Sequence, residues 1–405
     1  MKLSTRGVAW LAPYVWMVGS SASVAAQDIS QQAGEIASLM GPLLSSASTR
    51  ALGRVFARYE SDFVKYDDGY TDSYGNVIKG QWASCGPRWD CINYYDRAMI
   101  YYVWWQRTGK SKYLTRANQV ALNFRQQYLE SVKYSIVSHW AMTDGVALHY
   151  LVTGDLQSLL AIGRVGENMN YSAHVVTGQQ YDIFAANWQD DRTIAYIIKA
   201  LLAAYKLNAP SDGQNAYGWP AVPSWADALR YALNRTLTQA PNGPLSPDGQ
   251  WRGAHCANVE NGPITFHTTH PFTIGLLYDA LIRYYELFEK DPRILPAIKA
   301  SADILWRDDW IPSAGAFKYV GQGCWGEGAA DPAPDLNNLI VNGFAWIYKM
   351  TGDVTYKQRA DAMFATPVNG DSPSSGPKWF NQSYTSSYRY LSWRLSSVPP
   401  RPGGR

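Results

Sequence analysis

Six segments of the chain carry apolar residues on nearly every side of a helix rather than along one stripe. They are residues 95–107, 143–152, 193–207, 274–287, 339–350 and 384–395. A helix that is apolar all round is usually packed on both sides. The pattern therefore predicts six buried helices that form the inside of the fold.

Helices of a second kind alternate with these segments and carry a single apolar stripe, as in residues 50–66 and 113–128. Similar turns end three of the buried segments: Thr108-Gly109-Lys110, Thr153-Gly154-Asp155 and Thr351-Gly352-Asp353. Glycine supplies the left-handed residue that closes a helix, and an aspartate can cap the next one. The alternation predicts an all-α fold, an (α/α)6 toroid of six inner and about six outer helices. Residues 240–263 and 311–334 are expected to be loop inserts, with a short strand at 316–319.

The buried segments open in clusters of aromatic and polar residues. If the helices run side by side, these clusters meet on one rim, which we interpret as the active-site cleft. Its aromatic members, including one from an insert, are Trp89, Trp140, Trp188, Tyr319, Trp379 and Tyr384. Its polar members are His139, Asn187, Asp190, Asp191, Arg192, His267, His270, Lys378 and Asn381.

Aromatic residues are unusually frequent, with 17 Trp and 28 Tyr in 405 residues. Some of them pack the helices, but aromatic faces also stack on flat apolar ligand surfaces such as sugar rings. A polysaccharide is therefore the expected partner. No glycine-rich phosphate loop occurs, so no organic cofactor is expected. His267 and His270 have a spacing that suits a metal, but the sequence fixes no carboxylate partner, and no metal is predicted.

The first 26 residues have the features of an export signal. Lys2 and Arg6 precede an apolar run at 8–18, and small residues at 24–26 offer a cleavage site. We expect residues 27–395 to form one catalytic domain, exported to the periplasm or secreted, and residues 396–405 to be a disordered tail. The apolar run is too short to span a membrane, and no later stretch is long enough without charges.

Charge and cysteine content add two expectations. The formal net charge of +3 becomes 3 − 2 = +1 without Lys2 and Arg6, and no Lys/Arg-rich run occurs. Nucleic-acid binding is therefore not expected, and we predict a monomer. Four cysteines in an exported chain suggest two disulfides. Four cysteines can pair in three ways. We prefer the pairing of Cys85 with Cys91, which closes a small loop, and of Cys256 with Cys324.

The inner helix, Thr-Gly turn, outer helix and aromatic-polar starts resemble the (α/α)-toroid polysaccharide lyases, such as alginate and glucuronan lyases, and the six-hairpin glycosidases. The resemblance covers most of residues 50–395 and is architectural, since the Asn-Asn-His motif of one alginate lyase family is absent. It implies an exported enzyme that degrades a polysaccharide, with its cleft across the rim. Folds of this kind host several chemistries, so the reaction has to be argued from the residues.

Our preferred interpretation is a lyase that cleaves a uronate-containing, acidic polysaccharide by β-elimination. The reaction needs a group that neutralises the carboxylate, a base and an acid. Asn187 or Arg192 would neutralise the carboxylate. His139 or His267 would take the proton, and Tyr384 would protonate the leaving oxygen. The other rim residues would bind substrate. His267 and His270 fit a capping and packing role equally well, and a tyrosine placed like Tyr384 is more often a packing residue than a catalytic one.

Two alternatives remain open. An inverting glycoside hydrolase needs two carboxyl groups. The candidates are Asp90, Asp144, Asp190, Asp191, Glu260 and Asp335, of which we select Asp144, Asp190 and Asp191. The adjacent pair Asp190-Asp191 is similar to a paired-Asp motif of some toroid mannanases, although an Asp near a helix start is often a cap. A non-catalytic glycan-binding toroid would need the aromatic residues alone. Glutamate is scarce at the rim, which favours elimination over hydrolysis.

Overall fold

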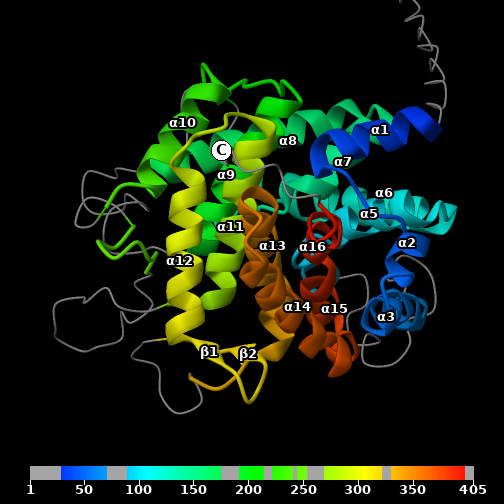
Figure 1. Cartoon of the computed structure of the whole chain (residues 1–405). Helices are drawn as coiled ribbons and strands as arrows, with labels where there is room; N and C mark the ends of the chain where they lie inside the picture. Colours follow the sequence, from blue (N-terminus) through cyan, green and yellow to red (C-terminus); the bar gives the residue numbers. More distant parts are fainter. Residues whose placement is uncertain are drawn as a thin grey trace, which may run out of the picture.

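The computed structural model describes residues 29–70, 89–174, 191–213, 221–239, 244–252, 269–321 and 330–396 (Figure 1). Within these ranges the chain is mainly α-helical, which confirms the predicted class. Strands β1 (Trp310–Ile311) and β2 (Ala316–Phe317) pair antiparallel below the end of α12 in Figure 1. The short strand expected at 316–319 is therefore present over its first half.

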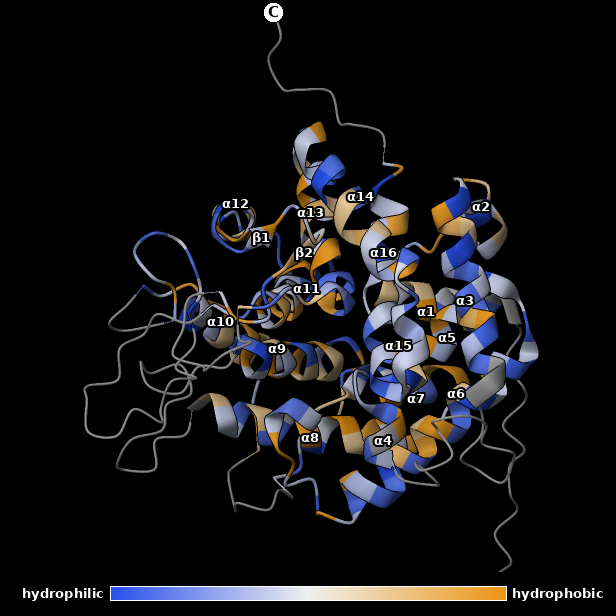
Figure 2. Ribbon diagram, turned by 90° about the horizontal axis from the view of Figure 1, so that it is seen from below, coloured by the Kyte–Doolittle hydropathy of each residue, from blue (hydrophilic) through white to orange (hydrophobic). Residues whose placement is uncertain are grey.

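The buried helices form a ring in which each helix contacts the next, and α15 contacts α5. They are α5 (Arg97–Thr108), α7 (Thr143–Thr153), α9 (Asp191–Lys206), α11 (Pro271–Leu287), α13 (Asn337–Thr351), α15 (Pro377–Tyr384) and α16 (Ser387–Trp393). Outside the ring lie α3 (Arg54–Tyr70), α6 (Ser111–Phe124), α8 (Leu156–His174), α10 (Trp225–Thr236), α12 (Ile294–Asp308) and α14 (Val354–Asn369). Figure 2 shows α6, α8, α10 and α12 toward the periphery. This arrangement is the predicted (α/α)6 toroid.

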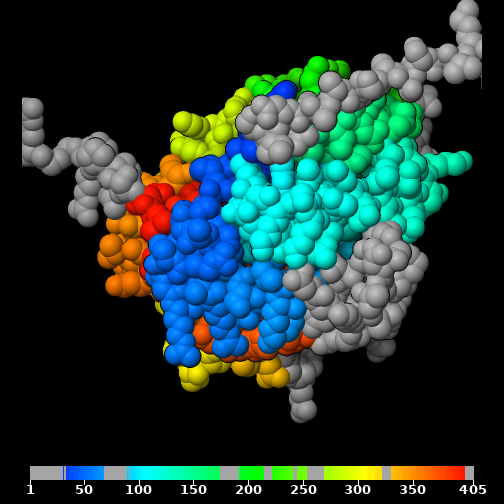
Figure 3. Space-filling model, turned by 90° about the vertical axis from the view of Figure 1, so that its right-hand side faces the viewer, coloured from blue at the N-terminus to red at the C-terminus, as the bar shows by residue number. Residues whose placement is uncertain are grey.

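The two ends of the described chain close the ring against each other. The hydroxyls of Tyr59 in α3 and Ser387 in α16 share a hydrogen bond of 2.7 Å. Ser392 donates to the carbonyl oxygen of Pro42 at 2.9 Å. Figure 3 accordingly shows the blue N-terminal helices beside the red C-terminal segment. The remaining short helices are α1 (Ile29–Met40), α2 (Ser46–Arg50), α4 (Trp89–Asn93), η2 (Arg125–Glu130), η3 (Ser138–Trp140), η4 (Pro334–Leu336) and η5 (Ser372–Ser375).

The Thr-Gly turns have the predicted geometry. Gly109, Gly154 and Gly352 end α5, α7 and α13 with φ angles of 70°, 72° and 72°, in the left-handed region that glycine adopts without steric cost. The Asp after the glycine caps the next helix in two cases. Asp155 accepts from the amide of Gln157 at 3.1 Å, and Asp353 accepts from that of Thr355 at 2.9 Å.

The sixth inner helix differs from the prediction. A continuous helix over 384–395 was expected, but α15 begins at Pro377 and α16 begins at Ser387. Proline suits the first helical position because its missing N–H has no partner to lose there. Ser386 interrupts the helix and donates its hydroxyl to the carbonyl oxygen of Asn338 in α13, 3.1 Å away. The predicted cluster at 379–382 therefore lies inside a helix rather than before one.

Some expectations fall outside what the structure describes. The export signal, the tail beyond residue 396 and the side chains of all four cysteines are among them. Among the described helices, none combines the length and apolar character that a membrane span requires.

Candidate active site

The starts of several inner helices meet at one end of the ring. Arg192 lies in the first turn of α9. It donates a hydrogen bond of 2.9 Å to the hydroxyl of Tyr94, which lies in the turn before α5. The amide of Gln382 in α15 donates to the carboxylate of Asp335 at 2.8 Å, just before α13. Asn381 of α15 also donates to the carbonyl oxygen of Ile92, 289 residues away in the sequence. These distant elements thus share one end of the ring, which we call the rim.

Asp191 is the first residue of α9 and is buried. Its carboxylate accepts a hydrogen bond of 3.4 Å from the hydroxyl of Thr273 in α11. Burial of a carboxylate beside a hydroxyl at a helix start is compatible with both a cap and a functional acid. The other predicted residues of this region lie outside the described residues: Asn187, Trp188, Asp190 and His267.

A cluster of half-buried aromatic side chains lines one part of the rim. The ring of Trp140 lies 4.9 Å from that of Trp89 and 4.7 Å from that of Tyr94, centroid to centroid. His139 lies 5.8 Å from Trp140 and is also half-buried. The structure therefore brings three of the predicted rim residues together with Tyr94.

Two predicted aromatic residues are exposed. Tyr319 exposes 43% of its surface and Trp379 exposes 36%. Tyr319 stacks on Phe272 of α11 at 5.5 Å, so its ring is held in place on one side. His270, which precedes α11, exposes 5% and lies 6.3 Å from Phe272. Exposed aromatic rings held in this way can stack on a sugar face.

Lys378 and Arg192 bring two cationic side chains to the rim. The pKa of the Lys378 ammonium is lowered, first by loss of water and also by repulsion from Arg192, while Asp335 acts in the opposite direction. An anionic group of a ligand placed near both cations would relieve this repulsion.

Tyr384 does not face the rim as predicted. It exposes 1% of its surface and packs between Tyr59, Phe63 and Trp104, with ring centroids at 4.8, 4.9 and 5.1 Å. Its hydroxyl donates to the carbonyl oxygen of Tyr59 at 3.2 Å, and burial raises its pKa well above the usual value. The prediction that Tyr384 is a proton donor to substrate is therefore wrong, because an aromatic core surrounds it.

Asn381 is also enclosed rather than open to a ligand. Its amide nitrogen donates to the carbonyl oxygens of Ile92 and Tyr94 at 2.7 and 2.6 Å. Its amide oxygen accepts from Arg97. All its polar atoms are used to join α15 to the turn before α5, so Asn381 positions that turn and does not bind substrate as predicted.

A narrow pocket lies on the inner side of the rim, where α5, α7, α9 and α11 meet the break between α15 and α16. Its polar lining consists of Tyr95, Asp96, Thr143, Asp144, Tyr196, Lys199 and Thr385. The hydroxyl of Thr143 is buried and has no hydrogen-bond partner within the described ranges. The pocket has room for about one water molecule, and a water there could bond to this hydroxyl.

Asp96 has a strained backbone. Tyr95 and Asp96 have φ angles of 63° and 62°, in a region that residues with side chains seldom adopt. The Asp96 carboxylate accepts from the amides of Met99 and Gly145 at 3.1 and 3.0 Å. A Cβ atom at Gly145 would lie 2.5 Å from Asp96 Oδ1. Glycine at 145 is therefore what lets α7 approach this carboxylate.

The pKa values of the two carboxyl groups of the pocket are shifted in opposite directions. Burial and, second, the negative charge of Asp144 raise the pKa of Asp96 to about 6. Burial acts in the same direction on Asp144, but Arg283 and Lys199 outweigh it and lower the pKa of Asp144 to about 2. Neighbouring carboxyl groups with opposite shifts are typical of acid–base sites.

Below the pocket, charged side chains fill the inside of the ring. Arg283 of α11 donates to both oxygens of Asp144 at 2.5 and 2.8 Å. Lys199 of α9 lies 3.6 Å from Asp144 and 3.1 Å from Asp279. Arg389 of α16 lies 3.2 Å from Asp279. We call Asp144, Lys199, Asp279, Arg283 and Arg389 the axial cluster.

The sequence interpretation missed Asp96 and the four members of the axial cluster other than Asp144. A signal was present, because Lys199, Asp279 and Arg283 each interrupt a segment that is otherwise apolar. Buried charges are rare unless they are paired. Asp96 stands directly before an apolar helix, where it looks like an ordinary cap.

Comparison with known proteins identifies the fold. No family model and no curated protein sequence matches the chain. Solved structures match it at low sequence identity. An unsaturated glucuronyl hydrolase specific for heparin is 12% identical, with a TM-score of 0.56 and coverage of 84% of this chain and 96% of that one. The α-1,6-mannanase GH76A from Salegentibacter sp. HEL1_6 is 13% identical, with a TM-score of 0.52 and coverage of 84% and 99%.

A third match is the unsaturated glucuronyl hydrolase from Streptococcus agalactiae. It is 11% identical, with a TM-score of 0.53 and coverage of 90% of this chain and 96% of that one. The matches extend over nearly the whole of each solved chain. The chain therefore has the toroid fold that these glycan-acting enzymes share.

Proposed function

We propose that this protein is a glycoside hydrolase whose reaction takes place at the rim, above the pocket that Asp96 lines. The observation that carries the proposal is the position of Asp96: a buried carboxyl group on a left-handed backbone, in the same pocket at the rim as the ionised Asp144. Hydrolysis of a glycosidic bond requires a carboxylic acid that protonates the leaving oxygen. A carboxyl group with a pKa of about 6 still holds its proton at pH 5, where an ordinary aspartic acid has lost it.

Asp191 is our candidate for the second carboxyl group, with Asp190 next to it in the sequence. It lies at the start of α9, on the same rim as Asp96, and Tyr196 of that helix lines the pocket. A variant of the similar α-1,6-mannanase in which two adjacent aspartates were replaced is described as inactive. This precedent supports the hydrolase that we had considered as the alternative to a lyase.

An acidic glycan is the substrate class that we propose. Arg192 and Lys378 provide positive charge at the rim, and two of the similar structures are glucuronyl hydrolases. Exposed Tyr319 and Trp379 would stack on sugar rings beside these cations. Elimination is less well supported. Tyr384, the proton donor that we expected for this reaction, is buried and cannot reach a substrate.

Replacing Tyr384 by Phe tests that last point. We expect full activity and a free energy of unfolding lower by about 1 kcal/mol, because one buried hydrogen bond to Tyr59 is lost. Activity assays and urea denaturation of both proteins measure the two effects. If the variant folds but has no activity, the Tyr384 hydroxyl takes part in the reaction after all.

The function itself is tested by offering the purified protein a panel of acidic and neutral polysaccharides. Hydrolysis produces new reducing ends without ultraviolet absorbance. Elimination on a uronate would produce an unsaturated sugar that absorbs in the ultraviolet. We expect reducing ends alone, and preferentially from acidic glycans. Binding without cleavage of any glycan would favour the non-catalytic alternative instead.

A further inference from the structure

Asp144 is held more firmly than a helix cap requires. It is the second residue of α7 and is buried, yet its carboxylate makes ion pairs with two other helices of the ring. Arg283 binds both of its oxygens, and Lys199 lies 3.6 Å away. A bidentate arginine fixes the orientation of a carboxylate as well as its charge.

The cations that hold Asp144 are themselves held from the other side. Lys199 also pairs with Asp279 at 3.1 Å, and Asp279 accepts a hydrogen bond from Asn342 at 3.1 Å. Arg389 lies 3.2 Å from Asp279. Because each charge of the axial cluster has a partner of opposite sign, Asp144 stays ionised although it is buried.

Asp144 is also adjacent to the group that we assign as the acid. The amide of Gly145, the next residue, donates to Asp96 Oδ2 at 3.0 Å. The absence of a side chain at Gly145 brings this part of α7 against the Asp96 carboxyl group. Asp96 and Asp144 line the same pocket, and neighbouring carboxyl groups cannot both ionise without electrostatic cost.

We propose that Asp144, clamped by Arg283 and Lys199, is a positioning residue whose fixed negative charge keeps the proton on Asp96 and thereby sets the upper pH limit of the reaction. This inference rests on the proposed function, in which Asp96 protonates the leaving oxygen. Asp144 itself would touch neither substrate nor the reacting atoms.

The charges around Asp96 determine the expected direction. The titratable and charged groups near Asp96 come from four parts of the chain: Tyr95 from the turn before α5, Tyr102 from α5, Asp144 from α7, and Tyr196 and Lys199 from α9. From α11 and α16, Arg283 and Arg389 act on Asp144. Of these groups, Asp144 opposes ionisation of Asp96, and Lys199 favours it.

Asp144→Asn is therefore expected to move the alkaline limb of the kcat/KM profile to lower pH, by about one unit or more. Asp96 would lose the repulsion and keep the nearby cations. At pH 7, a pKa lower by one unit leaves about tenfold less of the protonated acid. Lys199→Met should move the same limb to higher pH, because it removes a cation that favours ionised Asp96.

A matched control removes another arginine–aspartate pair. Arg394 donates to both oxygens of Asp361 at 2.7 and 3.1 Å, on α14 and away from the pocket. Asp361→Asn should leave the limb where it is. Carbon NMR of the Asp96 carboxyl group, assigned with Asp96→Asn, measures the same shifts without any substrate.

Opposite shifts in Asp144→Asn and Lys199→Met support the proposal. Folded variants whose activity falls while both the limb and the Asp96 titration stay unchanged would overturn it. If Asp144→Asn does not fold, Asp144→Ser, which also removes the charge, takes its place and should move the limb in the same direction. Absence of glycan cleavage by the wild-type protein would instead contradict the proposed function, and the NMR titration would still report on the Asp144–Asp96 relation.

Discussion

Asp96→Asn should reduce kcat on the natural glycan by a factor of about 10² to 10⁴, the usual contribution of a general acid. The amide cannot supply the proton that the leaving oxygen needs. Its oxygen can still accept from Met99, so we expect the variant to fold, with one of the two cap hydrogen bonds weakened. Initial rates at the pH optimum, together with circular dichroism, measure the effect.

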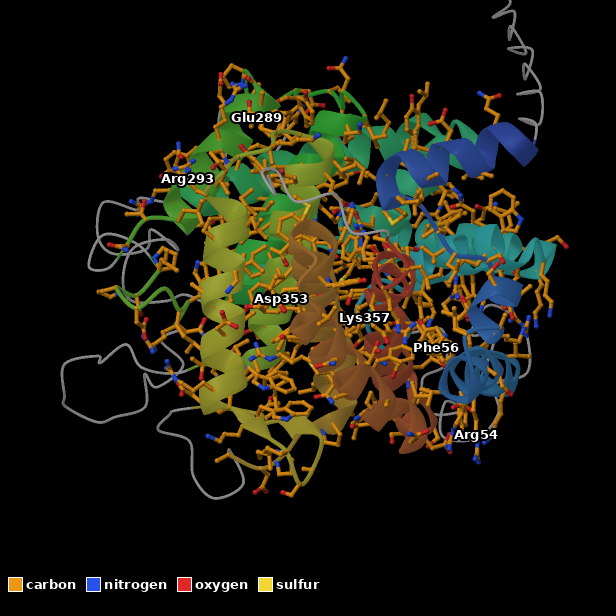
Figure 4. All side chains as sticks on the ribbon, in the orientation of Figure 1. Arg54, Phe56, Glu289, Arg293, Asp353 and Lys357 are labelled. Carbon is orange, nitrogen blue, oxygen red and sulfur yellow. The ribbon has the colours of Figure 1, made fainter. Side chains whose placement is uncertain are left out.

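Asp353→Asn is the matched control, because Asp353 also caps a helix and is labelled in Figure 4. It lies at the turn between α13 and α14, in one of the Thr-Gly-Asp turns. Both variants lose part of a cap, but only one loses the proposed acid. If the two variants kept equal activity, Asp96 would be a cap and nothing more.

Arg283→Met should lower the free energy of unfolding by about 3–5 kcal/mol, because it leaves a buried carboxylate with one partner fewer. Arg283 and Asp144 are both almost completely buried, and Lys199 would remain as the partner at 3.6 Å. Asp144 has a lowered pKa, so the stability that this pairing contributes is present above the ordinary aspartate value of 3.8. It is lost as the pH falls toward 2. Urea denaturation at pH 7 measures the loss.

Arg230→Met provides the comparison. Arg230 of α10 donates to Glu289, and Figure 4 places Glu289 and Arg293 at the exposed connection between α11 and α12. Solvent screens this pair, so its removal should leave the unfolding midpoint unchanged. Equal effects of the two substitutions would mean that the axial cluster adds no more to stability than a surface pair.

The ring of helices could be predicted because its signals are local. Helices that are apolar all round, amphipathic helices and Thr-Gly turns each follow from nearby residues, and Gly109, Gly154 and Gly352 close the inner helices as expected. The break at Ser386 could not be predicted in this way. It depends on a hydrogen bond to Asn338, on a different helix.

The candidate site was only partly predictable. Rim residues such as Arg192 and Trp140 could be found because they precede or open apolar helices. Tyr384 was misplaced because the start of its helix was placed seven residues too late, at 384 instead of 377. Asp96 was missed because its pKa and its backbone strain depend on α7, which the sequence cannot position against it.

The central claim is that the rim cleaves glycosidic bonds with water. Mass spectrometry of the products from one defined acidic oligosaccharide, treated with the wild-type protein and with Asp96→Asn, tests it most directly. We expect wild-type products whose masses add up to the substrate plus one water, and almost no product from the variant. Products that add up to the substrate alone, or unchanged cleavage by the variant, would contradict it.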